Sequence, residues 1–142
     1  MIDYAIVFGL AAILIVGAVL FAFISKVTVK KCSRRLDVEQ YRVKYLAIEN
    51  QLKRDEPSSY HLVVLNADKL VDSAMRECGV GGETMGERLK NNSSKFSDLN
   101  GLWTAHKLRN RIAHESDVTV NYDEARYALS CFKKALKDMG AI

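Results

Sequence analysis

The feature that most restricts this chain is an uncharged N-terminal run, which covers the 22 residues from Tyr4 to Ser25. As a helix, such a run rises about 33 Å, which is enough to cross a hydrocarbon core of about 30 Å. A cleaved signal peptide would have a basic start and a shorter apolar stretch, whereas this chain starts with Met1-Ile2-Asp3. The run therefore predicts a transmembrane anchor over residues 1–25, with the span at about residues 4–25.

The charges that follow the run predict its orientation. Five basic residues lie within ten positions of it, and none precedes it: Lys26, Lys30, Lys31, Arg34 and Arg35. By the positive-inside rule, we expect a single-pass protein of the cell membrane with its N-terminus outside and residues 26–142 in the cytoplasm. The five cations are then expected to contact the anionic headgroups of the membrane lipid.

The remaining charge is balanced, which bears on the class of partner. Of the 21 basic residues, five lie in the cluster after the run; of the 17 acidic residues, only Asp3 precedes Leu36. Sixteen of each therefore remain after Leu36. A neutral domain offers no broad basic surface for nucleic acid, and no DNA partner is expected.

The three cysteines do not form a metal or disulfide pattern in the sequence. Cys32, Cys78 and Cys131 are far apart, and none has another cysteine or a histidine at ligand spacing. No metal and no cofactor are expected. In a cytoplasmic domain, all three are expected to be reduced thiols, with Cys78 and Cys131 as small core residues.

Residues 26–56 form a basic segment and then a helix with one apolar stripe. The stripe is spaced 3, 4, 3 and 4, and its members are Val38, Tyr41, Tyr45, Ile48 and Leu52. The helix is expected to end before Pro57. A stripe two heptads long fits either a short coiled coil between two copies or one face packed on its own domain, and the sequence leaves both open.

Residues 57–142 predict a small bundle of about four helices, which makes the chain all-α. The first helix is expected over about residues 60–78, after a cap at Ser58 or Ser59. Thr84 and Glu87 form a capping box for a short second helix. Asp98 is expected to cap a long third helix that runs to about Glu115, and the last helix starts at Asn121 or Asp123.

The long third helix has two faces that favour burial. One carries Ala105, Leu108 and Ile112, and the other carries His106, Asn110 and His114 at i, i+4 and i+8. One face can pack on its own bundle, so the other predicts a partner surface and hence a homodimer. The alternative is a buried polar network in which the histidines and the asparagine satisfy one another while Arg109 pairs with an acid.

The hexapeptide from Arg109 to His114 resembles the Arg-x4-His signature of the HEPN superfamily (nucleotide-binding domains of higher eukaryotes and prokaryotes). Asn110 matches the polar residue often found directly after the arginine. The order of helices is similar as well, because the motif lies near the end of the penultimate long helix. The resemblance covers about residues 60–140. The segment Leu102–Glu115 also resembles bacterial membrane-anchored relatives of that fold, which imply no activity.

The resemblance implies a metal-independent ribonuclease or an RNA- or nucleotide-binding effector that acts as a symmetric dimer. His114 would then transfer a proton to or from the ribose 2′-OH or the leaving oxygen. Arg109 would hold the scissile phosphate, and Asn110 would orient His114 or the phosphate. Other HEPN domains are not catalytic, so the alternative is a dimerising scaffold or interaction module at the cytoplasmic membrane face.

Overall fold

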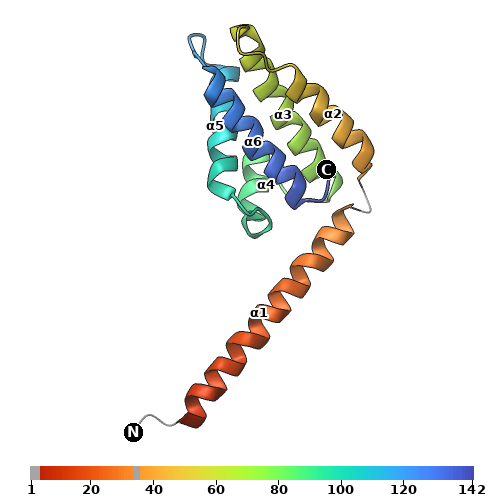
Figure 1. Ribbon diagram of the computed structural model, residues 1–142, viewed down its shortest axis with the longest axis vertical. Coiled ribbons are helices and arrows are strands. Elements are labelled where there is room, and N and C mark those ends of the chain that lie inside the picture. Colours follow the sequence, from red (N-terminus) through yellow and green to blue (C-terminus); the bar gives the residue numbers. More distant parts are fainter. Residues whose placement is uncertain (1–3, 34–35) are drawn as a thin grey trace.

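The computed structural model describes residues 4–33 and 36–142, with side chains described for residues 7–23, 32 and 36–142. The described residues form six α-helices, one short 3-10 helix and no strands, which confirms the all-α class. The elements are α1 (Tyr4–Ser33), α2 (Val38–Asn50), α3 (Pro57–Glu77), α4 (Met85–Asn91), η1 (Ser93–Lys95), α5 (Leu99–His114) and α6 (Tyr122–Asp138). Helix α1 projects away from a bundle that the other helices form (Figure 1).

The prediction of a membrane anchor is wrong. Within the described residues, no helix combines the length and the apolar character that a membrane crossing requires. The predicted localisation, a single pass with the N-terminus outside and residues 26–142 cytoplasmic, is corrected with it.

The lipid contacts predicted for the basic cluster fall outside the described residues. This applies to the side chains of Lys26, Lys30, Lys31, Arg34 and Arg35.

Helix α3 lies at the centre of the bundle, where it contacts α2, α5 and α6, while α5 also contacts α6 and α4. Its apolar stripe supplies the core, and Val63, Val64, Ala67 and Val71 are fully buried. The helix begins at Pro57, three residues before the predicted start, because proline needs no hydrogen-bond acceptor for its nitrogen in the first turn. Helix α6 completes the core, and its capping box at Asn121 has both expected hydrogen bonds.

Helix α2 packs on its own domain. Tyr41, Tyr45 and Ile48 of its stripe are buried, so the second of the two interpretations of this stripe is confirmed. The Tyr41 hydroxyl donates to Glu77 Oε1 at 2.8 Å and the Tyr45 hydroxyl to the carbonyl oxygen of Leu129 at 3.1 Å. Burial raises the pKa of both tyrosines above the ordinary value of 10.0, because it disfavours the phenolate.

The cysteines depart from the expectation of three reduced thiols. Cys32, near the end of α1, forms a disulfide with Cys78 at the end of α3, and their Cα atoms lie 4.9 Å apart. A separation of 46 residues in the sequence hides this proximity, because only the packing of the bundle brings the two ends together. Cys131 is a free, buried thiol, as predicted.

Candidate functional site

Helix α5 carries all three predicted site residues, and its start is fixed by a tight cap. Asp98 Oδ1 accepts a hydrogen bond from the Gly101 amide at 2.9 Å, which satisfies one of the free donors at the helix N-terminus. A Cβ atom on Gly101 would lie 2.6 Å from Asp98 Oδ2, so glycine leaves room for this carboxylate. The cap predicted at Asp98 is confirmed.

Both faces of α5 that favour burial are covered within the chain. The face with Ala105 lies toward α6, since both Ala105 and Ala128 line a groove between the two helices. The face with His106 lies toward α3, where the imidazole meets Asp68. Trp103 faces α4, because a Cβ atom on Gly86 would lie 3.6 Å from its ring. The helix therefore has no large apolar face left over for a partner subunit.

A buried polar network joins α5 to α3. His106 Nδ1 lies 2.8 Å from Asp68 Oδ1, and His106 Nε2 lies 3.2 Å from the Asn110 side-chain nitrogen. Arg109 closes the ring, because its Nη1 donates to Asn110 Oδ1 at 2.9 Å and its Nε lies 3.3 Å from Asp68 Oδ2. The network confirms the alternative interpretation in part: Arg109 pairs with an acid and His106 meets Asn110, whereas His114, the second histidine of the expected network, is exposed and takes no part in it.

The network assigns the protons of His106. The amide oxygen of Asn110 accepts from Arg109, so its nitrogen is the group that points at the imidazole. An amide nitrogen only donates, so His106 Nε2 is the acceptor and carries no proton. The proton of the neutral ring then sits on Nδ1 and is donated to Asp68.

Arg109 is fixed on one side and open on the other. Its Nε faces Asp68 and its Nη1 bonds to Asn110, whereas Nη2 makes no hydrogen bond to the described residues. Every buried side-chain nitrogen and oxygen among the described residues has a hydrogen-bond partner, so Nη2 is in contact with solvent. A guanidinium held in this way can present its outer edge to a phosphate oxygen.

His114 is the last residue of α5 and is exposed. It has no hydrogen bond or ion pair to the described residues, and it lies apart from the network. Arg109 and His114 are separated by five positions, about 140° around the helix. The structure therefore brings Arg109 and Asn110 together, but it does not bring either of them to His114. In particular, Asn110 orients Arg109 and His106 rather than His114.

Sequence reasoning missed Asp68. Its signal is an acidic residue within the buried stripe of α3, between Ala67 and Val71. Acidic side chains are rarely buried without a partner, so this position predicts a buried cation or donor nearby. The sequence places His106 on a polar line of α5 without assigning it a role, and the structure shows that it is one of four buried polar or charged residues among those whose side chains are described.

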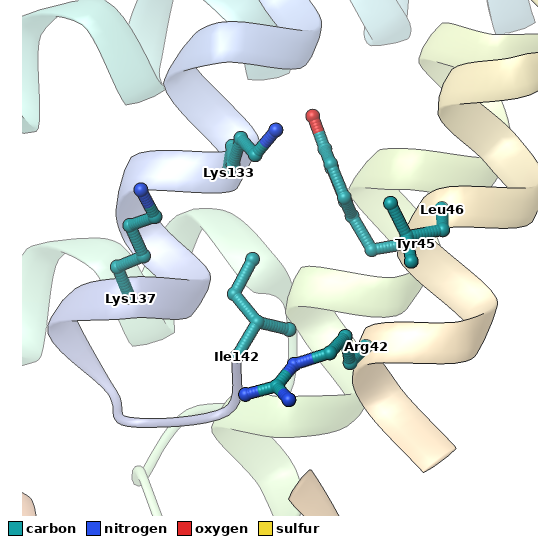
Figure 2. A pocket seen from close by; sticks show the side chains of 6 residues that line it. All are labelled: Arg42, Tyr45, Leu46, Lys133, Lys137 and Ile142. Atoms are coloured by element: carbon teal, nitrogen blue, oxygen red, sulfur yellow. The ribbon is translucent and has the colours of Figure 1, made fainter. Parts of the chain in front are cut away.

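A second cavity lies between α2 and α6, away from α5. Its volume is about 160 Å³, and its lining residues are Arg42, Tyr45, Leu46, Lys133, Lys137 and Ile142 (Figure 2). The Lys133 ammonium is already paired, because it lies 2.9 Å and 3.2 Å from the two carboxylate oxygens of Glu49. The Tyr45 hydroxyl also has a partner, because it donates a hydrogen bond to the carbonyl oxygen of Leu129. These contacts tie α2 to α6 and do not form a site.

Comparisons with known protein families, with curated proteins and with solved structures gave no match. The described residues contain no group of three or more His, Cys, Asp or Glu side chains that could hold a metal ion.

Proposed function

We propose that this chain is a HEPN-like domain that binds RNA and cleaves it without a metal ion, acting as a homodimer. The observation that carries the proposal is the fixed position of the Arg109 guanidinium. Asp68 and Asn110 hold its guanidinium in place while its Nη2 faces solvent, on the helix that ends in the exposed His114. A pre-positioned cation and an unpaired imidazole can both promote phosphodiester cleavage, the first by offsetting charge on the phosphate and the second by proton transfer.

The reaction would be attack of a ribose 2′-oxygen on the adjacent phosphorus. His114 takes the 2′-OH proton as the new P–O bond forms, the bond from phosphorus to the 5′-oxygen breaks, and the leaving 5′-oxygen takes a proton from solvent water, to which His114 later returns its own. Arg109 donates to a non-bridging oxygen and offsets the charge that develops there. The products are a 2′,3′-cyclic phosphate and a 5′-hydroxyl.

The proposed dimer rests on the separation between the two residues. Because Arg109 and His114 lie about 140° apart on one helix, a single copy cannot easily place both on one phosphate. Two copies related by a two-fold axis can each supply one of the two groups to each phosphate. Helices α3, α4 and α6 contact α5, so no uncovered apolar face of α5 favours the dimer.

The test is cleavage of a labelled single-stranded RNA by the full chain in the presence of EDTA. His114→Ala should reduce the rate by about 10²–10⁴-fold, the usual contribution of a general acid or base. His61→Ala is the matched control, because His61 is the third histidine and lies on α3, and its rate should not change. Cleavage that persists in His114→Ala, or that is absent in the wild-type chain, would overturn the proposal.

A non-catalytic dimerising module is the second candidate, and one observation favours it. Asp68 already balances the charge of Arg109 at 3.3 Å, and the ring of hydrogen bonds links α3 to α5 as a purely structural network would. On this view, His114→Ala has no activity to lose. The wild-type cleavage assay separates the two candidates directly.

A further inference from the structure

A shallow groove runs between α5 and α6, beside the line of residues that ends in His114. Its volume is about 250 Å³, and it is lined by Thr104, Ala105, Lys107, Leu108, Arg111, Glu124, Tyr127 and Ala128. Pockets that enclose a whole small ligand usually measure about 300–1,000 Å³. The groove is therefore better suited to one unit of an extended chain than to a complete small molecule.

The α5 side of the groove is cationic. Lys107, Arg111 and His114 follow one another at i, i+4 and i+7, so they share one exposed edge of the helix. Lys107 has no ion pair among the described residues, and Arg111 has only a contact of 3.6 Å with Glu115, in which both side chains are more than half exposed. Such a pair is weak in water and leaves Arg111 free to bind an anion.

The domain is neutral overall, but its charge is not evenly spread. Residues 99–114 of α5 contain Lys107, Arg109 and Arg111 and no acidic residue. The acid that lines the groove, Glu124, is turned toward the start of α6, where its Oε2 accepts from the Asn121 amide at 2.9 Å. The edge of α5 is thus a local positive stripe on a neutral domain, which is where a polyanion would be attracted.

The α6 side of the groove offers an aromatic ring. Tyr127 is 52% exposed, and it is the only exposed aromatic side chain in residues 36–142. An exposed ring beside a row of cations is the arrangement by which proteins bind single-stranded nucleic acid, since bases stack on the ring while phosphates contact the cations.

We propose that the groove between α5 and α6 binds single-stranded RNA, with its phosphates on Lys107 and Arg111 and a base stacked on Tyr127. The inference rests on the proposed function, because the same edge of α5 leads the strand to His114. The occupant is an extended single strand. A duplex exposes the faces of its bases only at its two ends, so its internal bases could not stack on Tyr127.

The test is fluorescence anisotropy with the full chain and a labelled 2′-O-methyl oligouridine of about 12 nucleotides, which lacks the 2′-OH and so cannot be cleaved by this route. Lys107→Ala/Arg111→Ala should weaken binding at least tenfold and lower the slope of log affinity against log salt by about 1.4, since each contact with a single strand contributes about 0.7. Tyr127→Leu should weaken binding about 5- to 150-fold, which corresponds to about 1–3 kcal/mol of stacking, while Tyr127→Phe should bind as the wild type does.

The matched control is Lys69→Ala/Lys90→Ala, which removes two exposed lysines outside the groove and should leave the affinity within twofold. Equal binding by the groove variants and the wild type, or an equal loss in the control, would overturn the inference. If the groove variants bind normally while RNA cleavage depends on His114, the groove is refuted and the proposed function stands. If they lose binding while the wild type cleaves no RNA, the groove is confirmed and the ribonuclease is refuted.

Discussion

Replacement of Asp68 by alanine is the most informative test of the network between α3 and α5. The Asp68 side chain is 6% exposed, and it faces both His106 and Arg109. Its removal leaves the Nδ1–H donor of His106 without an acceptor in a buried position, because the His106 side chain is only 9% exposed. Arg109 loses its acid as well, but its side chain is 35% exposed and can turn to solvent.

The expected cost follows from these exposures. A buried donor left unsatisfied costs about 1–3 kcal/mol, and the partly exposed pair with Arg109 adds about 0.5 kcal/mol. The total is about 1.5–3.5 kcal/mol, which at about 4 °C per kcal/mol lowers the melting temperature of a domain of this size by about 6–14 °C. Asp68→Asn should lose less, because the amide oxygen still accepts from His106.

The assay is urea unfolding of the full chain, followed by tryptophan fluorescence. Trp103 is the only tryptophan, and its ring centroid lies 6.0 Å from that of His106, so its emission reports on the network itself. The control is Asp117→Ala, since Asp117 is exposed and surface changes of this kind usually stay within about 0.5 kcal/mol. If Asp68→Ala unfolds at the same urea concentration as Asp117→Ala, the network contributes no stability and the reasoning is refuted.

Three further predictions concern the rest of the bundle. Gly82→Ala should lower the free energy of unfolding in a urea titration by more than about 1 kcal/mol, because φ of Gly82 is +139° and the new Cβ would lie 2.7 Å from the backbone nitrogen of Arg88. The control is Gly81→Ala, whose new Cβ would meet nothing within 4 Å and which should be neutral in the same titration. Burial raises the pKa of Tyr45, so the stability that the buried phenol contributes is present below pH 10 and is lost as the pH rises further. Tyr45→Phe should therefore lose less stability above pH 10 than the wild type does, and an equal loss in both proteins would contradict this prediction. Mass spectrometry of a non-reduced digest should find the peptides of Cys32 and Cys78 linked, and finding only free thiols there would exclude the bond.

The sequence was sufficient to predict the helices, because each has a local signal. The caps at Thr84 and Asp98 are present as predicted, since a cap depends on residues three positions apart. The sequence predicts the apolar stripe of α2, but it does not determine which surface the stripe packs against. A two-heptad stripe looks the same whether it packs on another copy or on α3, and only the bundle decides between them.

The candidate site was harder to predict, because its members come from different helices. The motif gave Arg109, Asn110 and His114, all on α5, while the residue that organises two of them, Asp68, lies 38 positions before His106. The same limit explains the disulfide, which joins positions 46 residues apart. Periodicity places a residue on a face of one helix, but it does not say which helix covers that face.

On the proposed function, different residues of α5 would supply RNA affinity and RNA cleavage. Asp68 balances the charge of Arg109, so this arginine can position a phosphate but adds little net attraction for a polyanion. The attraction would have to come from Lys107 and Arg111, which have no strong acidic partner among the described residues and lie on the exposed edge of the helix. Loss of these two cations should therefore weaken RNA binding without changing the chemistry at His114, whereas loss of His114 should do the reverse.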